Sequence, residues 1–314
     1  MSMLIKPNFF IVGAAKAGTT SLYKYLDQHK GIFFSPIKEP NYFSSDINPS
    51  EFRADYRNHT EIVGEKYFNS KPLRELHLSF VKEEKYYNQL FEKAKTETAI
   101  GECSTSYLFS DVAAKNIKEF NPEAKIIAIL RNPTERIYSH YLMGLRFGYT
   151  TKNFREAIEE DSQQTQKGWG ISKLYIELGM YARQLERYFN IFPKEQIKIY
   201  LNEELKNNPQ EVISDICTFL EVEDFELDLS QKHNIASIPK NKMLNKFMYQ
   251  SGLKNAVDGI LPKTLKSKLK LFFYETKEVI PINEKDKEFV KAIYKQDITE
   301  TAKLINKNLE NWLL

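Results

Sequence analysis

The stretch that decides the fold is Asn8-Phe9-Phe10-Ile11-Val12-Gly13-Ala14-Ala15-Lys16-Ala17-Gly18-Thr19-Thr20-Ser21. It begins as a short apolar run, continues as a loop of small residues and ends in the hydroxyl-rich start of a helix. This order is typical of a phosphate-binding loop, in which backbone N–H groups and the positive end of a helix dipole face an anion. An ordinary strand–turn–helix, with small residues selected for packing, is the competing interpretation.

The sequence of this loop differs from the motif of nucleoside-triphosphate-binding proteins. Their loop reads G-x-x-x-x-G-K-[ST], with a lysine directly after the second glycine. Gly13 and Gly18 keep this spacing, but Thr19 occupies the lysine position and Lys16 lies inside the loop. The stretch therefore predicts a site for a 5′-phosphate that lacks the usual contact to β- and γ-phosphates.

A second buried strand is predicted over residues 125–130, and it ends at Arg131. In triphosphate hydrolases such a strand commonly supplies a metal-holding aspartate. The next helix is predicted to begin with Asn132 as N-cap, Pro133 at the first position and Glu135 completing a capping box. An arginine at this strand end recognises phosphate through its planar guanidinium, so the pattern favours a second phosphate group over magnesium. A surface ion pair is the alternative role for Arg131.

These segments resemble the sulfotransferases that use 3′-phosphoadenosine-5′-phosphosulfate (PAPS), in particular the branch with the glycosaminoglycan enzymes and many bacterial proteins. The resemblance implies that Arg131 and Ser139 bind the 3′-phosphate, and that Lys240 or Lys242, after His233-Asn234, closes over it. It also implies that the 5′-phosphosulfate is bound by Lys16, Ala17, Gly18, Thr19, Thr20 and Ser21.

Catalytic roles also follow from the resemblance. The segment Lys38-Glu39-Pro40-Asn41-Tyr42-Phe43 matches the one that carries the family's catalytic base, which gives this role to Glu39. Lys16 is then expected to stabilise charge on the leaving phosphate oxygen. Residues 101–108 match another active-site segment, where glycosaminoglycan members often have a lysine and this chain has Cys103. No residue of this chain is therefore assigned the role of that lysine. Glu102 remains the alternative to Glu39 as base.

The resemblance implies in-line transfer of a sulfuryl group to a hydroxyl or amine of a glycan, lipid or small metabolite, with no metal. Two other classes stay open. The first is a nucleotide kinase of P-loop type, against which the missing lysine after Gly18 and the strand ending in Arg131 both count. The second is a non-catalytic nucleotide-binding protein, which a position of Glu39 remote from the pocket would favour.

Apolar runs alternate with helical patterns along the chain. This alternation predicts an α/β fold, a doubly wound parallel sheet with helices on both faces like that of P-loop proteins. Its 314 residues fit one domain spanning 1–314. Strands are expected at 8–12, 32–34, 99–101, 125–130 and 197–201, and helices at 19–29, 133–145, 180–190 and 209–220.

Two regions break the alternation. Residues 46–80 are polar, aromatic and too long for an ordinary connection, which predicts a lid or an acceptor-binding excursion. A helical C-terminal part is expected from about residue 240, and within it residues 261–273 form a basic amphipathic stretch. That stretch is interpreted as a packed helix with solvated lysines, with contact to a membrane surface as the alternative.

Composition limits the partners and the compartment. Lysine and arginine (45) nearly balance aspartate and glutamate (42), so the net charge of +3 gives no argument for a nucleic-acid partner. The two cysteines fit a reducing cytosol, and neither a signal peptide nor a transmembrane run is readable. The five histidines lack metal-ligand spacing. We therefore expect a cytoplasmic protein without a metal; its oligomeric state is not readable.

Overall fold

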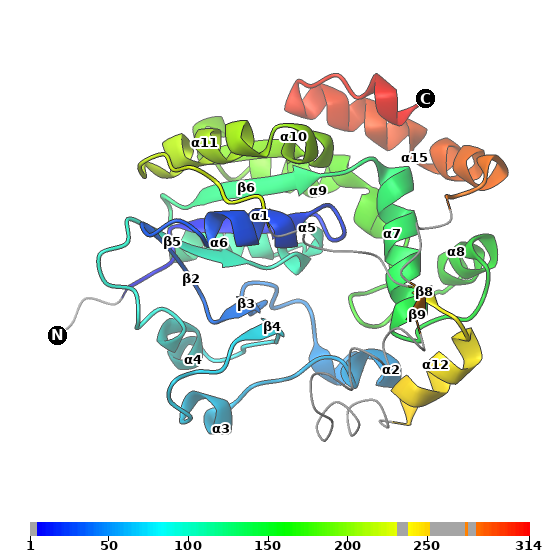
Figure 1. Ribbon diagram of the computed structural model, residues 1–314, viewed down its shortest axis with the longest axis horizontal. Coiled ribbons are helices and arrows are strands. Elements are labelled where there is room, and N and C mark those ends of the chain that lie inside the picture. The colour runs from blue at the N-terminus through cyan, green and yellow to red at the C-terminus, as the bar shows by residue number, and fades with distance from the viewer. Residues whose placement is uncertain (1–4, 231–237, 252–273, 276–280) are drawn as a thin grey trace.

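The central sheet is parallel and is flanked by helices on both faces (Figure 1). The computed structural model describes residues 5–230, 238–251, 274–275 and 281–314. The strand order is β2-β5-β1-β6-β7, so β1 is central and the order reverses beside it. The predicted doubly wound α/β fold is confirmed. The strands are β1 (Phe9–Gly13), β2 (Ile32–Phe34), β5 (Ala99–Cys103), β6 (Lys125–Leu130) and β7 (Ile197–Leu201).

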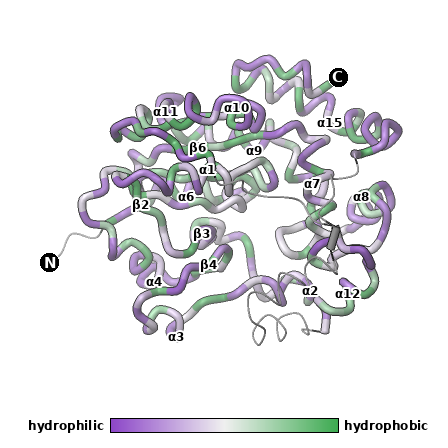
Figure 2. Tube along the Cα trace, in the orientation of Figure 1, coloured by the Kyte–Doolittle hydropathy of each residue, from purple (hydrophilic) through white to green (hydrophobic). Residues whose placement is uncertain are grey.

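The two central strands are buried on both faces. Every residue of β1 is buried, as is every residue of β6 after Lys125. A strand covered on both sides needs apolar residues at successive positions, which explains the continuous runs in the sequence. Figure 2 shows hydrophilic and hydrophobic residues alternating along the outer helices α10, α11 and α15, as expected for helices with one buried face. The bounds of these three are α10 (Asn202–Asn207), α11 (Pro209–Leu220) and α15 (Glu284–Ile305).

The expected helices are present with small differences at their ends. Helix α1 stops at Leu26, earlier than expected, and Cys217 is buried in the core face of α11 as predicted. The predicted stretch 261–273 and His233-Asn234 lie outside the described residues. The remaining helices of the main layers are α5 (Ser106–Phe109), α6 (Ala113–Phe120), α7 (Pro133–Arg146), α8 (Phe154–Ser162), α9 (Tyr181–Phe189) and α12 (Lys242–Gln250).

The N-terminus of α7 differs from the expected capping box. Asn132 accepts through Oδ1 from the N–H of Thr134 at 2.9 Å, two residues on. The carboxylate of Glu135 does not return to Asn132; its Oε2 accepts from Arg131 at 3.0 Å (Nε) and 2.9 Å (Nη2). The capping-box prediction is wrong because a charge-assisted pair with a guanidinium outcompetes a neutral backbone N–H.

Residues 46–80 contain a strand that the sequence patterns did not predict. Strand β4 (Leu76–Leu78) pairs in parallel with β3 (Ile37–Glu39), which places Glu39 opposite Leu78. This second sheet lies below the main one in Figure 1. The rest of the excursion consists of η1 (Pro49–Glu51), α2 (Ala54–Arg57) and α3 (Glu65–Phe68), and α4 (Glu84–Gln89) follows it.

Candidate active site

The loop between β1 and α1 (Thr19–Leu26) is tied to the neighbouring strands. The N–H of Ala14 donates to the carbonyl of Ile129 at 2.8 Å, and Asn202 Nδ2 donates to the carbonyl of Ala17 at 2.7 Å. Gly18 has φ +109°, and a Cβ there would stand 2.5 Å from Asn202 Nδ2. Only glycine fits this position, because any other residue would be strained and would displace Asn202.

The loop presents unused backbone donors. Helix α1 has no side-chain cap at Gly18. In the part of the chain that the structure describes, the N–H groups of Lys16, Gly18, Thr19 and Thr20 make no hydrogen bond to a protein acceptor. Open donors at the positive end of a helix dipole form an anion-binding site.

Positive charge gathers beside these donors. Arg131 Nη1 donates to the carbonyl of Lys16 at 3.4 Å. Burial, and then the charges of Arg131, Arg146 and Arg136, lower the pKa of Lys16 to about 8, although Glu39 acts in the opposite direction. Among the described residues, no carboxylate forms an ion pair with Lys16, Arg136 or Arg146. The cluster is therefore electrostatically incomplete without an anion.

Glu39 lies at the end of β3 as a buried carboxylate with 6% of its surface exposed. Its Oε1 accepts from Lys38 Nζ at 2.7 Å, and its Oε2 accepts from Thr105 Oγ1 at 2.8 Å and from the Thr105 N–H at 3.3 Å. Burial alone would raise the pKa of Glu39, but Lys38, His77 and the Thr105 hydrogen bond hold it below its usual value. Glu39 is thus ionised at neutral pH and fixed in orientation, as a general base must be.

Asn41 fixes the backbone that carries Glu39. It is fully buried with φ +53°, a conformation that asparagine tolerates better than most residues. Its Nδ2 donates to the carbonyls of Glu39 at 2.8 Å and Ser79 at 2.7 Å, and its Oδ1 accepts from Ser106 Oγ at 2.5 Å. The N–H of Asn41 donates to Ser104 Oγ at 3.0 Å. One side chain therefore joins β3, the end of β4 and the start of α5.

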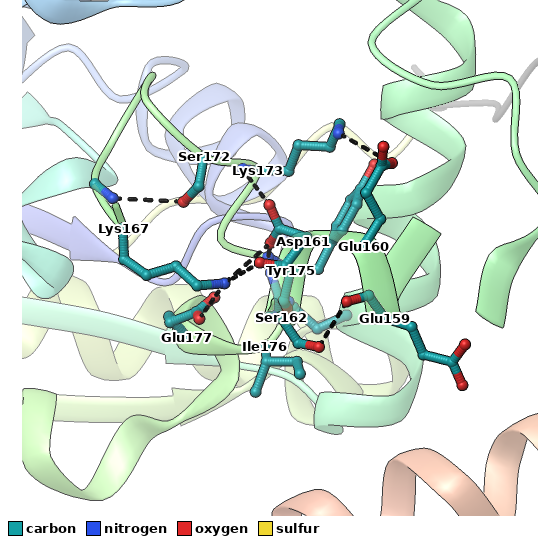
Figure 3. A network of polar contacts seen from close by, with 12 residues as sticks. Glu159, Glu160, Asp161, Ser162, Lys167, Ser172, Lys173, Tyr175, Ile176 and Glu177 are labelled. Carbon is teal, nitrogen blue, oxygen red and sulfur yellow. Dashed lines mark hydrogen bonds and ion pairs between the residues drawn. The ribbon is translucent and has the colours of Figure 1, made fainter. Parts of the chain in front are cut away.

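A second buried group supports α7 on the far side of the cluster. Arg136 is fully buried; its Nη2 donates to the carbonyl of Tyr175 and its Nη1 lies 3.4 Å from His140 Nδ1. Burial and Arg136 hold the pKa of His140 well below its usual value, so the ring is neutral. Asp161 accepts from the N–H groups of Lys173 at 2.7 Å and Tyr175 at 3.0 Å, and Figure 3 shows its carboxylate directed at this segment.

The structure brings together some of the residues expected at the site. Lys16 lies within the loop, Arg131 donates to its carbonyl, and Glu39 is close enough to affect the pKa of Lys16. Ser139 is half-buried on α7, and Lys240 is exposed directly after β8 (Ile238–Pro239), which packs against α7. The phosphate-binding roles of Ser139 and Lys240 remain predictions.

Other residues at the site were not found from the sequence. Asn202 follows β7 as Arg131 follows β6, so a polar residue at a strand end was a usable signal. His77 and Arg146 had no such signal, because the position of each depends on how distant segments pack.

Comparison with known proteins identifies the family. A family model described as a sulfotransferase domain matches residues 6–279, and the chain belongs to this family. The human bifunctional heparan sulfate N-deacetylase/N-sulfotransferase 3 is 26% identical over 226 residues, which cover 69% of this chain and 22% of that protein. The chain thus spans about a fifth of the length of this curated relative.

Solved structures agree with this assignment. A sulfotransferase from Alicyclobacillus acidocaldarius is 28% identical, with a TM-score of 0.69 and coverage of 98% of this chain and 99% of that one. A mouse sulfotransferase complexed with PAP is 12% identical, with a TM-score of 0.50 and coverage of 96% and 87%. The second likeness shows the shared fold.

The described residues hold neither a metal-binding cluster nor a membrane-spanning helix. There, no three side chains of histidine, cysteine, aspartate or glutamate gather in a way that could hold a metal ion. None of the helices described is both long and apolar enough to cross a membrane.

Proposed function

We propose that this chain transfers a sulfuryl group from PAPS to a hydroxyl or amine of an acceptor. The observation that carries the proposal is a loop with open N–H donors, with Arg131 hydrogen-bonded to the carbonyl of Lys16 and the buried, ionised Glu39 close enough to affect the pKa of Lys16. Membership of the sulfotransferase family and the PAP in the mouse structure support it.

The donor groups fit a nucleotide with two separate phosphates. The loop N–H groups and Lys16 suit the 5′ end, where open donors and a helix N-terminus meet. Arg131 stands at the carboxyl end of β6, just before α7, and suits the 3′-phosphate; Ser139 lies two turns into α7. PAPS would supply the activated sulfuryl group itself.

Each of the site residues has a separate role in the proposed reaction. Glu39 removes the proton of the acceptor as its oxygen or nitrogen bonds to sulfur. Lys16 and the loop N–H groups stabilise the charge that remains on the phosphate oxygen when its bond to sulfur breaks. Arg131 and Ser139 hold the far end of the nucleotide, so that the sulfur lies in line with the acceptor.

The acceptor in this proposal is a glycan, a lipid or a small metabolite. The relative named for heparan sulfate supports a glycan. We also propose that the chain acts as one domain and that residues 46–80 form the acceptor side, since β4 lies beside Glu39. The buried free cysteines Cys103 and Cys217 support a reducing compartment such as the cytoplasm.

Removal of Arg131 tests the 3′-phosphate assignment. Hydrogen bonds to charged groups contribute roughly 1.5–3 kcal/mol to binding. Arg131→Ala should therefore weaken the binding of PAP (adenosine 3′,5′-bisphosphate) about tenfold or more. AMP, which has no 3′-phosphate, should bind almost as before. Calorimetry with both ligands measures this difference. Equal losses of affinity for PAP and AMP would mean that Arg131 has a structural role, through its hydrogen bonds to Glu135 and to the carbonyl of Lys16.

Binding of PAP should depend on pH through Lys16. Its pKa of about 8 in the free protein rises when phosphate binds, so affinity is full below pH 8 and falls as Lys16 loses its proton. Between pH 7 and pH 9 we expect about a tenfold loss of affinity. Calorimetry at both pH values measures it, and Lys16→Met should abolish the dependence. A flat profile for the wild type would contradict this assignment.

A further inference from the structure

His77 lies beside the buried carboxylate of Glu39. It belongs to β4, and its Nε2 is 3.8 Å from Glu39 Oε1. The two side chains differ in their access to water: 66% of the His77 side chain is exposed, against 8% for Glu39. His77 therefore connects a buried group to the surface.

A buried base must lose the proton that it accepts before it can act again. Around Glu39, the ammonium of Lys38 and the N–H of Thr105 can only donate. The hydroxyl of Thr105 donates to Oε2 and would have to rotate before it could accept. Among the described contacts of Glu39, His77 Nε2 is the atom that can accept a proton and that also belongs to an exposed side chain.

We propose that His77 carries the proton from Glu39 to solvent, an inference that rests on the proposed role of Glu39 as base. With its own proton on Nδ1, His77 presents the lone pair of Nε2 to the protonated carboxyl. The O–H bond of Glu39 breaks as the Nε2–H bond forms, and the imidazolium then releases the Nδ1 proton to water. Rotation of the exposed ring closes the roughly 0.6–1 Å that separate the two atoms from hydrogen-bond distance.

The surroundings of His77 suit this role. A cavity of about 480 Å³ is lined by His77 together with Lys38 and Thr20, which gives water access to the ring. Partial burial is the main cause that lowers the pKa of His77; Glu39 acts in the opposite direction, and Lys38, Lys16 and Lys24 lower the pKa further. The ring is therefore neutral and ready to accept at neutral pH. The charged groups that face it are Glu39, Lys38, Lys16 and Lys24.

Kinetics of three variants test the relay. The assay is release of labelled sulfate from PAPS with water as acceptor, so no acceptor need be known. His77→Ala and His77→Gln should each lower kcat about tenfold or more with KM for PAPS unchanged. Added imidazole should restore the kcat of His77→Ala. With substituted imidazoles, the restored kcat should follow the order of their pKa values. The matched control is His29→Ala, three residues after the end of α1, which should keep its rate and show no response to imidazole.

The relay is overturned if His77→Ala turns over within twofold of the wild type, or if its loss is not restored by imidazole. An NMR titration tests the interaction between His77 and Glu39 without a measurement of turnover. The pKa of His77 should fall in Glu39→Gln, because the carboxylate that raises it is gone. An unchanged pKa would also overturn the relay. If instead Glu39→Gln released sulfate at the wild-type rate, the role of Glu39 as base would fail and the relay with it. The proposed function would fail only if the wild type released no sulfate from PAPS.

Discussion

Glu39→Gln should abolish most turnover while PAP still binds. The amide keeps the size of the side chain and can accept one hydrogen bond, but it cannot take a proton from the acceptor. We expect kcat to fall by about 10²–10⁴ and the affinity for PAP to stay within about twofold. Sulfate release from labelled PAPS and calorimetry with PAP measure the two quantities on the same preparation.

Glu102→Gln is the matched control for this change. Glu102 is equally buried at the end of β5, where its carboxylate accepts from Tyr87 at 2.5 Å and from Ser104 at 2.7 Å. Burial raises its pKa to about 7. Both oxygens are engaged away from the loop, so we expect less than a tenfold loss. The reverse ranking, with Glu39→Gln near wild type and Glu102→Gln inactive, would transfer the role of base to Glu102.

Lys16→Met should produce the second large effect. The change removes the charge that is placed to stabilise the leaving phosphate oxygen, while the apolar stem still packs in the loop. Loss of one such electrostatic group typically costs about 10²–10³ in kcat. Lys115→Met on the exposed side of α6 removes the same charge and should leave the rate within twofold. Equal losses in the two variants would mean that only the overall field of the protein matters.

The sequence patterns predicted the main sheet because its central strands are buried on both faces and its edge strands are largely apolar. Strands of this kind read as continuous apolar runs, and the observed bounds of β2, β6 and β7 match the expected ranges. The short strands β3 and β4 escaped prediction because each has three residues and gains its stability from the other. No local pattern reports a pairing between segments that lie 39 residues apart, from Ile37 to Leu76.

The candidate site was predictable where the backbone defines it. Gly18 and the strand end at Arg131 are local features, and the structure places Arg131 against the loop through the carbonyl of Lys16. The partners of Glu39 were not predictable: Thr105 reaches it through the packing of distant segments, and His77 had no position until β4 paired with β3. The failed capping box at Glu135 has a local cause, because the guanidinium that attracts its carboxylate belongs to Arg131, four residues earlier.

The central claim is tested most directly by incubating the protein with sulfur-labelled PAPS in excess EDTA and following the label. The account predicts that label passes to water or to an acceptor fraction at the same rate with EDTA as with magnesium. It also predicts that Glu39→Gln is about 10²–10⁴ slower and that ATP gives no phosphoryl transfer. Retention of all label in PAPS, together with magnesium-dependent phosphoryl transfer from ATP, would contradict the account and establish a nucleotide kinase instead.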